Sequence, residues 1–263
     1  MMSKPTSSSS SSGGGGGMKN SKKSIPSSSS SSEILFVTNK MCPFAQKAWI
    51  ALEAADISYK LEQVSLYGPG GKPDWFWKLN PKGQVPILQV INNNNYNNNN
   101  NDSNDYIIAD SDQILDEIGM VTMNTSHKNK QSSSVVSSKT SKLFVVHSDD
   151  EATAAVKINA FRSTLNEFLP IGKEAVLGGG DRKRMWKKLK EIDNLLGEEG
   201  PYILDDKLTI ADCAAFPFLW RINEEFSTGW KDNGCEKIPI WLDYCSKQPP
   251  FANSIQSSWW WWW

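Results

Sequence analysis

The sequence has 263 residues, and its 28 Lys and Arg residues nearly balance 29 Asp and Glu residues, so the formal net charge is −1. Such a balance gives no overall positive field to attract nucleic acid or anionic lipid. The longest apolar run, Cys213 to Trp220, contains a proline and is too short for a membrane-spanning helix. The sequence therefore predicts neither a nucleic-acid partner nor a membrane span.

The cysteines and histidines argue against a disulfide framework and a metal site. The four cysteines are widely spaced and form no Cys-x-x-Cys pair, and there are two histidines. The N-terminus has no apolar core of a secretory signal. We therefore expect a cytoplasmic protein with free thiols and no bound metal.

Segments of low complexity divide the chain. We expect a disordered Ser/Gly-rich tail over 1–32, a Ser-rich linker over 121–142 and a further tail over 256–263. The folded domains would then be 33–120, with an Asn-rich insertion at 92–105, and 143–255. A flexible insertion at a hairpin tip is tolerated because the entropy of loop closure grows only with the logarithm of length.

The first domain is predicted to mix strands and helices. Glu33 to Thr38 has the apolar residues of a buried strand, and a helical pattern begins at Pro43, which places Cys42 at the N-cap. We expect further strands at Ser58 to Val64, Gln84 to Ile91 and Tyr106 to Ala109. An irregular segment precedes the strand that begins at Gln84, and a closing helix follows at Ser111 to Ile118. This order is that of an α/β thioredoxin-like domain.

The second domain is predicted to contain helices alone, in an all-α C-terminal helical bundle. Thr209 and Asp212 have the spacing of a capping box at the start of an almost wholly apolar helix, Ile210 to Ile222, which Pro217 is expected to bend. The other predicted helices are Ala152 to Phe168, Arg182 to Leu196 and Ile238 to Ser246.

Cys42 is the candidate nucleophile. A thiol at a helix N-terminus faces unpaired N–H groups and the positive end of the helix dipole, which favour the thiolate and predict a lowered pKa. The alternative is a small buried residue that fills the corner between strand and helix. Ala45 stands where a dithiol motif has its second cysteine, so a redox cycle would need an external thiol, of which glutathione is the abundant one.

Three other motifs are candidates for ligand binding. If the Val85–Pro86 bond is cis, the Val85 backbone would be open to an extended peptide; an ordinary trans proline at a strand start is the alternative. Asp110–Ser111, before a helix, could bind a carboxylate and an ammonium group, or could simply cap the helix. Lys72, in a Gly/Pro-rich loop, could meet an anion or could be a solvated surface charge.

Together these motifs resemble the cytosolic glutathione transferases that have a catalytic cysteine. The matching strings are Cys42-Pro43-Phe44-Ala45-Gln46, Lys72-Pro73-Asp74-Trp75-Phe76, Asn80-Pro81-Lys82-Gly83-Gln84-Val85-Pro86 and Asp110-Ser111. They look most like the omega class, and the lambda and dehydroascorbate reductase classes are close relatives. The resemblance covers 33–118 and continues more weakly over 143–255.

The resemblance implies a site for glutathione. Cys42 would form a mixed disulfide with it, Val85 would pair with the cysteinyl backbone beside a cis Pro86, Asp110–Ser111 would hold the γ-glutamyl end, and Lys72 would meet the glycyl carboxylate. The family more often has Glu where Asp110 stands. Because the Asp side chain is shorter, we expect it to bind the ammonium group of glutathione less tightly. Phe44 and Trp220 are the candidates for the walls of the acceptor pocket.

The resemblance also implies the chemistry. Family members with a cysteine tend to form a disulfide with glutathione, so we expect a thiol transferase or reductase that acts on disulfides or dehydroascorbate. The partners would be glutathione and a small-molecule or protein disulfide acceptor, and a homodimer is allowed. Two alternatives stay open: a non-catalytic interaction module of the same fold, and a chloride-channel-like relative that inserts into membranes.

Overall fold

The protein is represented by a computed structural model. The predicted N-terminal tail up to residue 31, residues 93–104 of the Asn-rich insertion, residues 129–142 of the linker and the tail 256–263 lie outside the residues that it describes. The described residues are 32–66, 71–92, 105–128, 151–198, 200–204 and 206–255.

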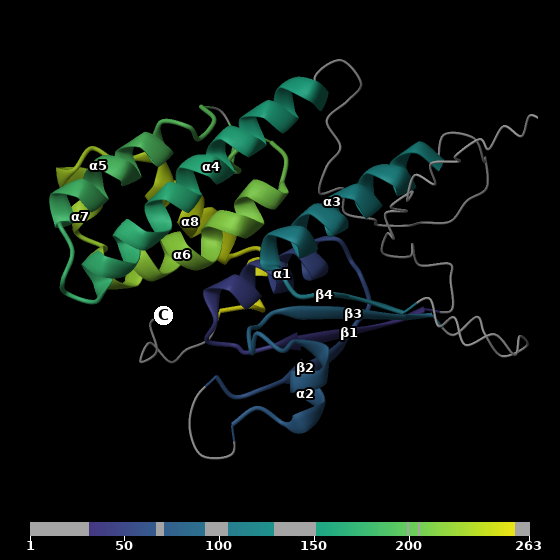
Figure 1. The fold of residues 1–263 in the computed structure, drawn as a ribbon. Helices are drawn as coiled ribbons and strands as arrows, with labels where there is room; N and C mark the ends of the chain where they lie inside the picture. Colours follow the sequence, from purple (N-terminus) through teal and green to yellow (C-terminus); the bar gives the residue numbers. More distant parts are fainter. Residues whose placement is uncertain are drawn as a thin grey trace, which may run out of the picture.

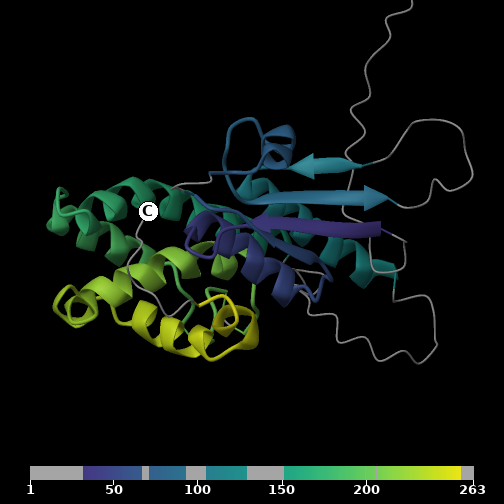
Figure 2. The same cartoon turned by 90° about the horizontal axis from the view of Figure 1, so that it is seen from below.

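A four-stranded sheet forms the centre of the first half of the chain, in the order β2-β1-β3-β4 (Figures 1 and 2). Strand β1 pairs with β2 in parallel and with β3 antiparallel, and β3 pairs antiparallel with β4. The bounds are β1 Ser32–Thr38, β2 Lys60–Gln63, β3 Ile87–Asn92 and β4 Tyr106–Ile108. The predicted thioredoxin-like arrangement is confirmed.

Helices cover both sides of this sheet. Helices α1 (Pro43–Ala54) and α3 (Ser111–Lys128) lie on one side, and the short α2 (Asp74–Leu79) lies on the other (Figure 1). Apolar side chains of the strands and of α1 and α3 enter one large buried cluster that continues into the helical half. A smaller cluster, at the end of β1, packs against α2.

The second half of the chain is helical, as predicted, and α6 lies at its centre. Nearly all residues of α6 from Ile210 to Leu219 are buried, and α6 contacts α1, α3, α4 and α8. The helices are α4 Glu151–Val176, α5 Arg182–Asp193, α6 Ile210–Phe226, α7 Gly229–Asp232, α8 Lys237–Ser246 and α9 Pro249–Ala252.

The predicted capping box of α6 is confirmed. The Thr209 hydroxyl accepts a hydrogen bond from the Ala211 N–H, while Asp212 accepts from the Thr209 N–H at 2.8 Å. Asp212 also accepts from the Ile203 N–H and from the Trp241 indole, both at 2.9 Å. One buried carboxylate therefore fixes the start of α6 and joins it to α8.

Several predicted boundaries differ from the structure. Helix α3 continues to Lys128, into the segment predicted as a linker, because a formed helix propagates where no proline stops it. Helix α4 continues beyond Phe168 through Pro170, and buried Phe168 and Ala175 anchor it on both sides of the proline. The irregular segment before β3 contains α2, which at six residues is too short to show a helical period.

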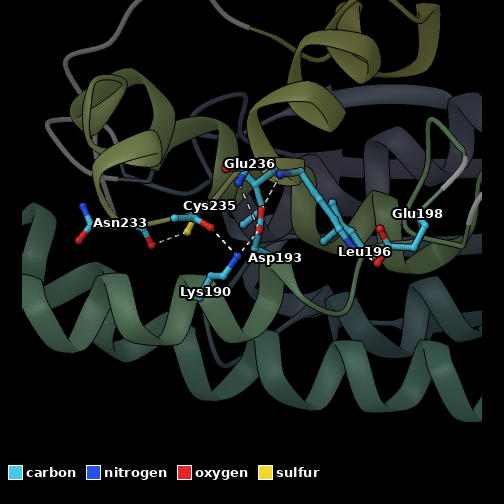
Figure 3. A network of polar contacts seen from close by, with 10 residues as sticks. Lys190, Asp193, Leu196, Glu198, Asn233, Cys235 and Glu236 are labelled. Carbon is cyan, nitrogen blue, oxygen red and sulfur yellow. Dashed lines mark hydrogen bonds and ion pairs between the residues drawn. The ribbon is translucent and has the colours of Figure 1, made fainter.

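A second buried carboxylate fixes the start of α8, and no sequence pattern indicated it. Asp193, at the end of α5, accepts hydrogen bonds from the N–H groups of Glu236, Lys237 and Ile238 at 3.2, 2.9 and 2.8 Å (Figure 3). Lys190 Nζ lies 3.1 Å from its Oδ2. Asp193 thus satisfies unpaired donors at the start of a helix that begins 44 residues later in the chain.

Removal of this carboxylate should destabilise the helical half. We expect Asp193→Ala to lower the free energy of unfolding by about 2–4 kcal/mol, because three backbone donors lose their acceptor. Asp243→Ala is the control: its ion pair with Lys247 has side chains 68% exposed, and such a pair contributes at most about 1 kcal/mol. Urea unfolding followed by circular dichroism measures both, and equal losses would contradict this role of Asp193.

Candidate functional site

Cys42 lies where β1 turns into α1. It is the N-cap of α1, with extended backbone angles, and Pro43 follows at the first helical position, as predicted. The side chain is partly buried, whereas the thiols of Cys213, Cys235 and Cys245 are buried. Among the four free cysteines, Cys42 is therefore the least buried.

The Asn39 side chain shapes the loop that holds Cys42. Its amide donates to the Val64 carbonyl at 2.8 Å, and its oxygen accepts from the Met41 N–H at 2.9 Å. The Asn39 carbonyl accepts from the Cys42 N–H at 3.0 Å. The position of the thiol is thus set by the ends of β1 and β2 together.

The smaller apolar cluster brings the predicted motifs together. Buried Val85 and Phe76 belong to it, and Cys42 and Ala109 pack against its edge. These residues come from the thiol motif, the segment before β3, α2 and the residue before Asp110. The structure therefore gathers at one place four segments that are far apart in the sequence.

Val85 is a polar neighbour of the thiol. The Val85–Pro86 peptide bond is cis, and Cys42 Sγ donates to the Val85 carbonyl over 3.9 Å. No residue in the described part of the chain accepts a hydrogen bond from the Val85 N–H. A backbone donor is therefore available beside the sulfur.

The predicted low pKa of the thiol is contradicted. Burial raises the pKa of Cys42 above its ordinary value, because the neighbouring apolar side chains exclude water from a thiolate. The backbone N–H groups of Ala45 and Phe44, then the charges of Arg221 and Lys47, oppose this effect. The helix N-terminus acts in the expected direction, but desolvation outweighs it.

Arg221, on α6, is the main residue of the site that sequence reasoning missed. Its Nη1 donates to Gln46 Oε1 and to the Pro217 carbonyl, both at 2.6 Å, and its Nη2 donates to the Met41 carbonyl at 3.2 Å. Gln46 also donates to the Ser254 carbonyl at 3.2 Å. A cation in an otherwise apolar helix was the available signal, because a buried charge needs partners.

Lys47 is a second cation near the thiol. Its side chain is 2% exposed, and Nζ lies 2.8 Å from Asp112 Oδ1, which Arg162 also contacts at 3.0 Å. Burial lowers the pKa of Lys47, and the charge of Asp112 opposes that shift. This ion pair joins α1 to the start of α3, next to the predicted γ-glutamyl site.

The predicted end groups of the site, Lys72 and Asp110, each have partners of their own in the structure. Lys72 Nζ donates to the Leu66 carbonyl at 3.3 Å and lies 5.8 Å from the ring centre of Phe76. Asp110 Oδ1 accepts from the N–H groups of Asp112 and Gln113 at 2.9 and 3.0 Å. Of the pair Asp110–Ser111, it is therefore Asp110 that caps α3, and Ser111 is buried at the first position of the helix.

One of the two predicted wall residues lies beside the thiol. Phe44 is 38% exposed and meets Phe218 of α6 edge-on, with ring centres 5.1 Å apart. Trp220 instead stacks on Phe216 at 5.5 Å. Because residues two apart point to opposite faces of a helix, Trp220 faces away from Phe44, and the α6 side chain that meets Phe44 is that of Phe218.

Two family models match the chain. The model described as glutathione S-transferase, N-terminal domain, matches residues 41–119, and that of the C-terminal domain matches residues 153–245, together more than half of the chain. The chain belongs to the glutathione S-transferase family. The predicted resemblance and the two-domain fold are both confirmed.

The chain is similar to individual proteins that are named as glutathione S-transferases. It is 23% identical over 206 residues to a rice protein, probable glutathione S-transferase DHAR2, chloroplastic, a match that covers 78% of the chain and 60% of the rice protein. Glutathione S-transferase DHAR3, chloroplastic, from Arabidopsis thaliana is 22% identical, over 70% of the chain and 57% of that protein. The chain thus spans less than two thirds of the length of these relatives.

A solved structure has the same fold. The crystal structure of glutathione transferase Omega 2S from Trametes versicolor superposes with a TM-score of 0.65 at 17% identity, over 85% of this chain and 94% of that one. In the described residues, no group of three or more His, Cys, Asp or Glu side chains could hold a metal ion. No helix in that part of the chain is long and apolar enough to cross a membrane.

The raised pKa of Cys42 predicts how its reactivity depends on pH. A thiol with a raised pKa is mostly protonated at neutral pH, so the rate of alkylation by iodoacetamide should rise about tenfold per pH unit from pH 7 and continue to rise beyond pH about 8.5, where a free cysteine levels off. Peptide mass spectrometry measures the rate at Cys42, with N-acetylcysteine as the reference. A plateau reached below pH about 7 would show that the thiolate is stabilised instead.

Proposed function

We propose that this transferase is a glutathione-dependent thiol transferase or reductase that works through a mixed disulfide between Cys42 and glutathione. The observation that carries the proposal is the partly buried thiol of Cys42 beside the Val85 carbonyl and the Val85 N–H, for which the described residues offer no acceptor. A peptide in extended conformation that pairs with Val85 would bring its own cysteine to this sulfur. Family membership and the names of the DHAR relatives support the same function.

The binding of glutathione would use both sides of the thiol. We propose that Lys72 meets the glycyl carboxylate and that Ser111, at the start of α3, receives the γ-glutamyl carboxylate. One oxygen of Asp110 is engaged in capping, and the other is the proposed acceptor for the ammonium group. Phe44 and Phe218 would form the apolar wall that faces the acceptor.

The reaction would proceed in two balanced steps. First, the Cys42 thiolate attacks the glutathionyl sulfur of a substrate disulfide, forms the mixed disulfide and releases the substrate thiolate. Second, the thiolate of free glutathione attacks the glutathionyl sulfur, oxidised glutathione departs, and the electron pair of the broken bond stays on Cys42. With dehydroascorbate as acceptor, the net reaction consumes two glutathione molecules and yields ascorbate and oxidised glutathione.

The proposal extends to location and partners. Free thiols and glutathione persist together in a reducing compartment, which favours the cytoplasm. The acceptor would be a small-molecule or protein disulfide. A second copy of the chain is a further proposed partner.

Exposure to oxidised glutathione tests the mixed disulfide. We expect the intact mass of the wild type to show one glutathionyl group, on Cys42, and that of Cys42→Ser to show none, because the other thiols are buried. Cys235→Ser is the matched control and should be modified like the wild type. A wild type that stays unmodified would overturn the proposed function.

Removal of the Lys72 charge should weaken the binding of glutathione. We expect Lys72→Ala to raise KM for glutathione about fivefold with kcat nearly unchanged, because a partly exposed ion pair contributes about 1 kcal/mol at most. Lys78→Ala, at an exposed lysine of α2, is the control and should leave KM unchanged. An equal effect of the two substitutions would remove Lys72 from the proposed site.

A steady-state assay separates the enzyme from the non-catalytic alternative. The proposal predicts turnover of a glutathionylated peptide, of dehydroascorbate or of both, and weak conjugation of glutathione to an aromatic electrophile. Retention on immobilised glutathione without turnover of either acceptor would instead favour an interaction module.

A further inference from the structure

Arg221 is a partly buried cation that has hydrogen bonds but, among the residues that the structure describes, no anionic partner. All three of its acceptors are neutral oxygens, those of Met41, Gln46 and Pro217. Within the described ranges no carboxylate forms an ion pair with it, whereas Lys47 is paired with Asp112. Removing a charge from water without a counter-ion costs free energy, so the burial of this guanidinium lowers the stability of the folded protein.

Arg221 binds the segment that carries the thiol, on both sides of Cys42 in the sequence. Its Nη2 binds the carbonyl of Met41, the residue directly before Cys42. Burial lowers the pKa of Arg221 to about 10, and the charge of Cys42 opposes that shift. Of the two cations that act on Cys42, Arg221 has the larger effect, and the charge of Lys47 is already offset by Asp112.

We propose that Arg221 is the counter-ion of the Cys42 thiolate and that it acts chiefly when Cys42 leaves the mixed disulfide. The role of Arg221 in the departure of Cys42 from the mixed disulfide rests on the proposed function. Arg221 is a positioning residue, since its positive charge acts on the Cys42 sulfur and its Nη2 donates a hydrogen bond to the Met41 carbonyl. It comes from α6, so the helical half of the chain supplies the charge for a nucleophile that belongs to the thioredoxin-like half.

The chemistry of the second step explains why a counter-ion matters there. As glutathione attacks, a sulfur–sulfur bond forms in oxidised glutathione, the bond to Cys42 breaks, and negative charge develops on Cys42 Sγ. A thiol of lower pKa leaves faster, whereas the apolar surroundings raise the pKa of Cys42. The positive charge of the guanidinium stabilises the developing thiolate and so opposes part of the effect of the apolar surroundings. No proton has to be transferred for this.

A comparison of Arg221→Met with Arg221→Lys separates charge from packing. Arg221→Met removes the positive charge. Arg221→Lys keeps the charge but loses the paired N–H donors of the guanidinium. In the alkylation of Cys42 by iodoacetamide, which needs no glutathione, we expect Arg221→Met to shift the pH profile upward and to slow the reaction about fivefold at pH 8, as for a loss of about 1 kcal/mol. Arg221→Lys should stay within about twofold of the wild type.

The resolving step is measured on the mixed disulfide formed beforehand. We expect Arg221→Met to slow the release of oxidised glutathione about fivefold after glutathione is added, and Arg221→Lys to restore it. Circular dichroism checks folding, and Arg221→Gln takes the place of Arg221→Met if that variant unfolds. Equal pH profiles for charged and uncharged variants would overturn the inference. A wild type that forms no mixed disulfide would overturn the proposed function, while the alkylation profiles would still decide the role of Arg221.

Discussion

The Cys42 sulfur lies between two opposing influences: apolar side chains that keep water away from it, and N–H groups and cations at the start of α1 that favour its charge. The effect of the apolar side chains is the larger one, so the neutral thiol is the favoured form. A disulfide is also neutral. The same surroundings would therefore favour the proposed mixed disulfide with glutathione over the free thiolate, and the steps in which the thiolate appears would need electrostatic stabilisation.

This constraint explains why the two halves of the chain are joined at the first turn of α1. Arg221 of α6 reaches Met41 and Gln46, and Gln46 in turn holds Ser254 beyond α9. Phe44 packs on Phe218 in the same region. A shift of the helical half would therefore move both the charge and the apolar wall next to the sulfur, which makes the contact between the halves part of the site.

Patterns within short segments made the fold predictable. The strand before Cys42, Pro43 after it and the capping box at Thr209 and Asp212 are local signals, and the structure contains each of them. Two kinds of feature could not be predicted from the sequence. Contacts between distant segments, such as those of Asp193 with α8 or of Arg221 with Met41, have no signature in local sequence. The pKa of the thiol also depends on how tightly several segments close around it, and the helix end alone gave the wrong direction.

The central claim is that the Cys42 sulfur bonds to glutathione while the tripeptide pairs with Val85. A crystal structure of the protein after reaction with oxidised glutathione tests it most directly. We expect continuous electron density between Cys42 Sγ and the glutathione sulfur, with the cysteinyl backbone hydrogen-bonded to the N–H and carbonyl of Val85. Glutathione bound with its sulfur turned away from an unmodified Cys42, or bound at another surface, would contradict it.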